Sequence, residues 1–243
     1  LFRSRTLEAE RARRETKPVI QVIIIAEGQT EETFVRDVMA PAFAASGIIL
    51  TARLVEVAGG GRGGALSYER VWKFLRNTLR DRIDTYVSTF FDLHKLDTAF
   101  PAHAESLKII DSGRRAGYLE TAFHADVIKR AGCRPERFIP HIQPWEFEAL
   151  LFSDLTALTG TETSWAKHLP ALQKIRSGFD HPEQINGGQD TKPSARLGLL
   201  RNPGFHKVRH GPLAARSIGL DRIEAECPHF AAWLQQLRTL APL

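Results

Sequence analysis

The clearest hydrophobic pattern in the chain is the stretch from Val19 to Ala26, which is apolar except for one glutamine. It ends at Glu27 and a glycine. A short run of this kind, rich in β-branched residues, is typical of a strand buried on both faces in a parallel sheet covered by helices. A helix is expected from about Glu31, with Thr30 as its N-cap. Pro41 is expected to bend or end this helix, because proline removes a backbone donor.

The alternation of strand-like and helical patterns continues along the chain. Strands that alternate with helices imply right-handed crossovers and a parallel sheet. Pro140 favours an edge position for the last strand. From Pro144 onward the pattern changes to a short helix, followed by helical stretches and no further strand. The remaining predicted elements are strands at 48–57, 84–91 and 137–142, and helices at 66–80 and 102–131.

These patterns divide the chain into three parts. Residues 1–17 are charged and poor in β-branched residues, so we expect an arm outside the core. Residues 18–152 are expected to form an α/β domain, a parallel sheet with helices on both faces. Residues 153–243 are expected to form a basic helical appendage packed on that domain.

Composition narrows the class of protein. With 43% hydrophobic and 25% charged residues, the chain resembles ordinary globular proteins. No apolar run approaches the ~20 residues of a membrane helix, and the first residues lack the apolar core of a signal peptide. Cys133 and Cys227 lie far apart without metal-ligand spacing, so we expect both to be reduced. The cytoplasm is the expected location.

Positive charge is concentrated near the C-terminus. The segment from Asp190 to Arg216 contains six basic residues and one acidic residue, a net charge equal to the +5 of the whole chain. Such a field suits a polyanion such as nucleic acid, although a solvated basic surface explains it about as well. The candidate contacts to a nucleic-acid backbone in this segment are Lys192, Ser194, Arg196, Lys207 and Arg209.

A glycine-rich stretch, A-G-G-G-R-G-G at residues 58–64, follows the second predicted strand. Its backbone could form a nest for a phosphate group, with Arg62 as the charged partner. A loop at the rim of a binding site is an equal alternative. The stretch lacks the G-K-[ST] ending of a P-loop, which argues against ATP binding.

Two predicted strands end in carboxylates, Glu27 after the first and Asp92 after the third. In open α/β sheets the binding crevice lies outside the carboxyl ends of the strands. Two acids there can share a hard divalent cation, which polarises a phosphodiester and lowers the pKa of bound water. Glu31, four residues after Glu27, could reach the same space. The alternative is that each acid caps a nearby helix.

The motif E-G-Q-T-E after a buried strand, followed by F-D-L-H at the end of another, resembles the Toprim fold of topoisomerases, bacterial primases and OLD-family nucleases. Residues 18–152, with P-E-Q-I-N, K-P-S-A-R and C-P-H-F-A-A-W-L, resemble a bacterial Toprim-like family often encoded beside an ABC-type or OLD-like ATPase. The resemblance implies a Rossmann-like sheet with metal ligands at Glu27 and Asp92. The second Toprim aspartate falls on His94, which suits Mg²⁺ less well than a carboxylate does.

The missing oxygen ligand could come from Glu146 or Glu148 in W-E-F-E-A-L-L-F. Two residues apart on an α-helix, their side chains would point about 200° away from each other. We therefore expect one to face the metal and the other to form a salt bridge. By resemblance to related nucleases, Lys207 is the candidate that neutralises charge on the phosphate.

The resemblance implies a Mg²⁺- or Mn²⁺-dependent Toprim nuclease, with DNA favoured over RNA as substrate and an ATPase as partner in phage defence or DNA repair. A second hypothesis, favoured by His94, is a binding or sensor subunit without chemistry of its own. A small phosphorylated substrate and a homo-oligomeric state are left open. The chain contains neither the H-E-x-x-H motif of zinc peptidases nor the G-x-S-x-G motif of serine hydrolases.

Overall fold

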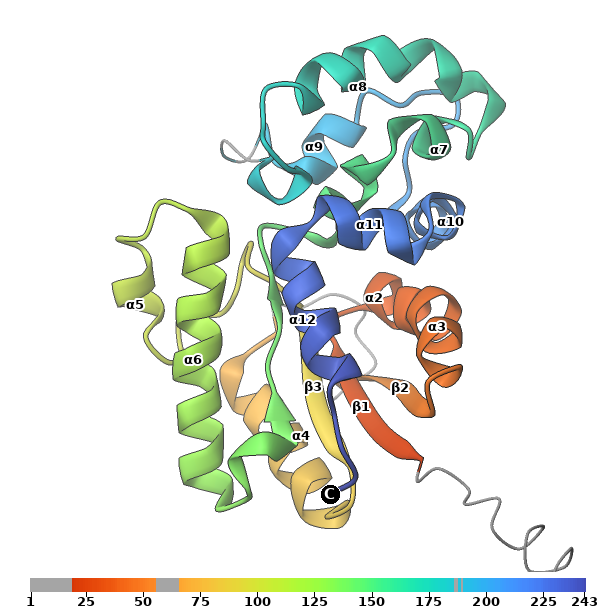
Figure 1. The fold of residues 1–243 in the computed structure, drawn as a ribbon. Coiled ribbons are helices and arrows are strands. Elements are labelled where there is room, and N and C mark those ends of the chain that lie inside the picture. Colours follow the sequence, from red (N-terminus) through yellow and green to blue (C-terminus); the bar gives the residue numbers. More distant parts are fainter. Residues whose placement is uncertain (1–18, 56–65, 186–187, 189) are drawn as a thin grey trace, which may run out of the picture.

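The computed structural model describes residues 19–55, 66–185, 188 and 190–243. The predicted N-terminal arm and the glycine-rich stretch with Arg62 lie outside these residues. The described chain forms a parallel five-stranded sheet with helices on both faces, which confirms the predicted α/β class (Figure 1). No helix in this part of the chain is long and apolar enough to cross a membrane. Cys133 and Cys227 are both free.

The sheet has the strand order β2-β1-β3-β4, and β5 also pairs with β3. The predicted fourth strand is split in two around Pro140 and His141, and it lies at the edge, as its proline indicated. The strands are β1 (Ile20–Ala26), β2 (Ile48–Leu54), β3 (Tyr86–Asp92), β4 (Phe138–Ile139) and β5 (Ile142–Gln143).

Both faces of the sheet are buried, because alternate residues of each strand point to opposite sides. Ile24 and Phe90 belong to a core shared with α2, α3, α10 and α12. Ile25 and Phe91 belong to a second core shared with α4 and α6. The register pairs Ala26 with Phe90, so the residues that follow β1 and those that end β3 meet at one edge of the sheet.

The first helical segment differs from the prediction. It comprises α2 (Gln29–Phe34), a π-helical turn η1 (Val35–Met39) and α3 (Ala40–Ala44). Its N-cap is Gly28 rather than Thr30, which is buried in the first turn instead. Pro41 lies in the first turn of α3, directly after the π-helical turn, and helical structure continues past it. A π-helical turn widens the backbone locally, which accommodates a residue without a donor.

The C-terminal region is a layer of the fold as well as an appendage. Helices α10 and α12 bury apolar side chains in the core that also contains β1 and β3. Figure 1 shows α7, α8 and α9 beyond the end of the sheet where α2 begins. The remaining helices are α4 (Tyr68–Asp81), α5 (His103–Ser106), α6 (Ser112–Ala131), α7 (Leu155–Thr159), α8 (Leu169–Arg176), α9 (Pro193–Leu197), α10 (Lys207–Ile218), α11 (Leu220–Glu226) and α12 (Pro228–Arg238), with short 3₁₀ helices η2 (Pro135–Arg137), η3 (Phe147–Ser153), η4 (Thr163–His168) and η5 (Pro182–Gln184).

Helix α10 packs closely against α2 and η3 at Gly211, which is buried. A Cβ atom on Gly211 would lie 3.0 Å from Thr30 Cγ2 and 3.2 Å from Phe147 Cε1. The absence of a side chain therefore sets how near α10 comes to the carboxyl ends of β1 and β3. Lys207 lies one turn earlier on the same helix.

We expect Gly211→Ala to lower the free energy of unfolding by about 1–3 kcal/mol, because the added methyl group overpacks this contact. Gly117→Ala is the matched control, since Gly117 also lies inside a helix but has no atom within 4 Å of an added Cβ. That control should gain about 0.5–1 kcal/mol from helix propensity. Urea denaturation measures both; equal effects of the two substitutions would contradict the packing argument.

Candidate functional site

The carboxylates at positions 27 and 92 meet at the tips of adjacent strands. The backbone N–H of Asp92 donates a hydrogen bond of 3.0 Å to Glu27 Oε2. Glu27 is exposed as a residue, but burial of its carboxylate raises the pKa of Glu27. The hydrogen bond from Asp92 acts in the opposite direction. Asp92 is buried, and its Oδ1 accepts the N–H of Phe147 at 2.8 Å. Asp92 therefore caps the start of η3 with Oδ1, and its Oδ2 faces Lys207.

Glu31 reaches the same space from the first turn of α2. It is 2% exposed. A Cβ on Gly28 would lie 3.1 Å from Glu31 Oε2, so the glycine of E-G-Q-T-E leaves room for this carboxylate. The four-residue spacing from Glu27 to Glu31 thus brings a second carboxylate of the motif to the end of β1.

Glu146 and Glu148 point to different partners. The backbone of Trp145 has a φ of 62°, and a 3₁₀ helix rather than the predicted α-helix begins at Phe147. Left-handed backbone in a bulky residue costs about 1–3 kcal/mol, a strain that local packing must offset. Glu148 is fully buried and faces Lys207, whose Nζ lies 3.6 Å from its Oε1. Glu146 forms an ion pair of 2.7 Å with Lys192 and accepts the N–H of Ser194 at 3.0 Å.

Lys207 supplies the positive charge at the centre of the cluster. From the first position of α10 its Nζ lies 3.2 Å from Glu31 Oε1 and 3.3 Å from Asp92 Oδ2. Its side chain is 40% exposed, while the ammonium group at its tip lies against three buried carboxylates. Glu27, Glu31, Asp92 and Glu148 thus form one group around Lys207, which we call the acid cluster.

Three carboxylates of the acid cluster, those of Glu27, Asp92 and Glu148, have raised pKa values. Burial raises the pKa of Asp92 well above its ordinary value, and the charges of Glu27 and Glu31 add to this rise. Burial also raises the pKa of Glu148 to about 7, although Lys207 acts in the opposite direction. Burial alone would lower the pKa of Lys207, but the surrounding carboxylates outweigh it and raise that pKa, so Lys207 remains an ammonium.

His94 lies beside the acid cluster rather than in a contact with it. Its ring packs near Trp145 at a centroid distance of 6.3 Å, and both line a cavity of about 270 Å³. Its Nε2 is buried and accepts or donates no hydrogen bond among the described residues. Burial and the charge of Lys192 lower the pKa of His94, so the imidazole is neutral at physiological pH.

The basic residues proposed for nucleic-acid binding occupy several environments. Lys192, Ser194 and Lys207 engage glutamates of the site, as described above. The guanidinium of Arg196 lies over the Phe179 ring at 5.5 Å and its Nε donates to a backbone carbonyl. Arg209 is exposed and pairs with Glu162 at 3.1 Å. Arg62 lies outside the described residues.

A group of residues that the sequence did not bring together lies at the β4–β5 edge. Glu120 on α6, His141 between the two strands and His229 on α12 place ligand atoms within 4.8 Å of one another. The sequence lacks the local H-E-x-x-H motif of zinc peptidases. Residues separated by 21 and 88 positions form no local motif, so the tertiary structure alone reveals this group.

A family model described as a domain of unknown function, DUF4276, matches residues 26–238. The chain belongs to this family. The match spans the acid cluster from Glu27 to Lys207, and it crosses the predicted boundary at residue 152, so the sheet domain and the helical region form one family unit. No curated protein and no solved structure matches the chain.

Glu148→Gln is expected to stabilise the metal-free protein at alkaline pH. Because the folded-state pKa of Glu148 is about 7 against an ordinary value of 4.5, the folded state binds this proton more tightly than the unfolded state does. Its contribution to stability is present at low pH and is lost as the pH rises through about 7. A glutamine cannot ionise, so the variant should exceed the wild type at pH 8 by roughly 1–3 kcal/mol and match it near pH 4, below the ordinary pKa of a glutamate.

Urea denaturation in EDTA at several pH values measures this difference. Glu105→Gln is the control, since Glu105 is exposed on α5 and its substitution should change stability by less than about 0.5 kcal/mol. A Glu148→Gln variant that is less stable than the wild type at pH 8 would show that the carboxylate contributes favourably to the metal-free fold.

Proposed function

We propose that this chain is a divalent-metal-dependent hydrolase of phosphodiester bonds in nucleic acid, with Mg²⁺ or Mn²⁺ held by the acid cluster. One observation carries the proposal: Glu31 Oε1 and both side-chain oxygens of Glu148 are buried and accept no hydrogen bond among the described residues, and their one cationic neighbour there is Lys207. Buried carboxylates need compensating charge or protons, and Lys207 supplies only one positive charge to four acids.

The donor set fits a hard cation, which takes carboxylate oxygens and keeps several waters. Glu27, Glu31, Asp92 and Glu148 would hold it. Glu146 is not included, because Lys192 and Ser194 already engage both of its oxygens. When bound, such an ion polarises a phosphodiester and lowers the pKa of a bound water.

The chain's own residues would position the nucleic acid. Lys207 is partly exposed and stays protonated, so its ammonium group can stabilise the negative charge that develops on the phosphate. Arg209 is exposed two residues further along, where it can contact the backbone of a nucleic acid. The preference for DNA, the ATPase partner and a role in phage defence or DNA repair rest on the Toprim-like sequence resemblance.

A non-catalytic binding or sensor subunit is the second candidate. It is favoured by His94, which takes the place of the second Toprim aspartate and faces a different cavity. In this case Lys207 would be the permanent counter-ion of the acid cluster. The two candidates differ in whether the purified chain binds Mn²⁺.

Asp92→Asn tests the proposal. The wild-type chain, alone and co-expressed with an ABC-type or OLD-like ATPase from the same genome, should bind Mn²⁺ in calorimetry and cleave end-labelled DNA or RNA. The variant should lose at least about 100-fold in cleavage while its circular dichroism spectrum is unchanged. Glu105→Gln serves as the control with wild-type activity.

Cleavage that survives in Asp92→Asn would remove the enzyme hypothesis. A chain that copurifies with the ATPase but does not bind Mn²⁺ would favour the second candidate.

A further inference from the structure

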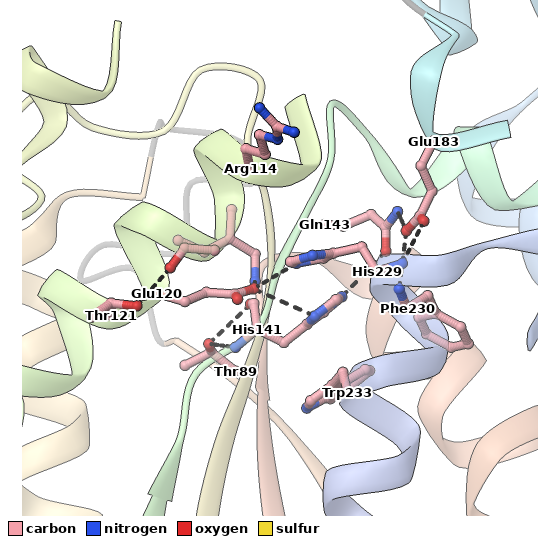
Figure 2. Close-up of polar contacts among 12 residues, drawn as sticks. Thr89, Arg114, Glu120, Thr121, His141, Gln143, Glu183, His229, Phe230 and Trp233 are labelled. Carbon is pink, nitrogen blue, oxygen red and sulfur yellow. Dashed lines mark hydrogen bonds and ion pairs between the residues drawn. The ribbon is translucent and has the colours of Figure 1, made fainter. Parts of the chain in front are cut away.

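A second group of candidate ligands lies away from the acid cluster. Figure 2 shows Glu120 and His229 reaching toward His141 from helices on either side of the β4–β5 segment. His229 Nε2 lies 2.9 Å from Glu120 Oε1, and His141 Nδ1 lies 3.6 Å from the same oxygen. His141 is 1% exposed, whereas Glu120 and His229 are less deeply buried.

The hydrogen bonds behind His141 determine which ring nitrogen carries its proton. Glu183, which is fully buried, accepts backbone N–H groups from His229 and Phe230 and the side-chain N–H of Gln143. Because Gln143 gives its amide N–H to a carboxylate, its oxygen is the atom that faces His141 Nε2 at 3.2 Å. His141 Nε2 must therefore donate, which assigns the proton to that nitrogen.

This tautomer points a lone pair of His141 Nδ1 at a carboxylate oxygen. The His141 ring also stacks on that of His229 at a centroid distance of 5.2 Å. A cation shared by the two imidazoles and Glu120 relieves the contact. The chain from Glu183 through Gln143 to His141 has the form that outer residues take around metal-ligating histidines.

We propose that Glu120, His141 and His229 bind a divalent transition-metal ion of the zinc class. Two imidazole nitrogens and one carboxylate oxygen are ligands that Zn²⁺ accepts. At Zn–ligand distances of about 2.0–2.2 Å, tetrahedral ligand atoms lie roughly 3.3 Å apart, between the 2.9 and 3.6 Å found here. The N–H of Ile142, which donates to Glu120 Oε1 at 2.7 Å, fixes the position of the carboxylate.

A cavity beside the three ligands would let an ion enter, and the ligands come from both helical layers of the fold. A cavity of about 370 Å³ opens beside the site and is lined by Glu120, Thr121, His124 and Gln236 among others. The three ligands come from α6 on one face of the sheet, from the edge segment, and from α12 on the other face. A bound ion would therefore join the two helical layers across the β4–β5 edge.

The test uses the full chain with Asp92→Asn as background, which removes one of the four carboxylates of the acid cluster, and with Zn²⁺ and Co²⁺ as probes. We expect one Zn²⁺ per chain in calorimetry after EDTA treatment and dialysis, a rise in melting temperature, and Co²⁺ absorption bands typical of a four- or five-coordinate site. Co²⁺ should also quench Trp233, whose ring stacks on His141 at a centroid distance of 4.2 Å.

His229→Gln and Glu120→Gln should each weaken Zn²⁺ binding at least tenfold and reduce the Trp233 quenching. His124→Gln is the matched control, since His124 lines the same cavity but is not one of the three ligands. His206→Gln tests the pair formed by His210 on α10 and His206, the N-cap of that helix, whose rings lie 5.8 Å apart, and it should leave binding unchanged.

Two results would overturn the proposal. The first is a folded chain in the same background that binds no Zn²⁺ with micromolar or tighter affinity, an outcome that does not depend on how the ligand variants fold. The second is binding that His229→Gln and Glu120→Gln leave intact. Because the background lacks Asp92, these outcomes are independent of those that test phosphodiester hydrolysis.

Discussion

The acid cluster depends on one ammonium group that lies among carboxylates largely removed from water. Lys207 contacts Glu31, Asp92 and Glu148 at 3.2–3.6 Å. A surface ion pair of this length contributes little to stability, but a buried carboxylate without compensation is costly. Burial first, and then the neighbouring carboxylates, raise the pKa values of Asp92 and Glu148, and the single positive charge of Lys207 does not offset this. The site is therefore suited to bind a cation or protons.

The fold maintains this unfavourable arrangement by packing around it. Strands β1 and β3 are covered on both faces, so their carboxyl ends are fixed by cores that contain no polar atom of the cluster. Gly211 lets α10 approach α2 and η3 closely enough for Lys207 to reach the strand ends. Strain at Trp145 accompanies the turn that precedes the 3₁₀ helix carrying Glu148. Residues that lower stability locally are thus concentrated where chemistry would need them.

The strongest periodic segments could be predicted from sequence, because one kind of interaction dominates each. Strands β1 and β3 and helix α4 follow the apolar pattern, and the proline at 140 correctly indicated an edge strand. The same logic brought Glu27 and Asp92 to neighbouring strand tips. The side chains of Glu146 and Glu148 diverge, as expected, and Glu146 forms the salt bridge with Lys192. Glu148 lies against Lys207, and its role as a metal ligand stays a prediction. The cause of the divergence is different, because the backbone there is a 3₁₀ helix preceded by a left-handed residue rather than an α-helix.

What the sequence could not indicate depends on long-range packing. Lys207 and Asp92 are separated by 115 positions, and the helix that carries Lys207 runs through Gly211 and Pro212, a pair that ordinarily marks a break. The π-helical turn before Pro41 is likewise a tertiary adjustment.

The group of Glu120, His141 and His229 at the β4–β5 edge also depends on long-range packing. No local pattern marks any of the three residues, and they meet because α6 and α12 flank this edge of the sheet. The two proposed sites also differ in ligand chemistry. Carboxylates and an ammonium gather at the strand ends, where oxygen ligands suit Mg²⁺ or Mn²⁺, whereas imidazoles gather at the edge, where nitrogen ligands suit a softer ion. Since the ligand sets share no residue, occupation of one site need not require the other, and a single fold can assign hard and borderline cations to separate positions.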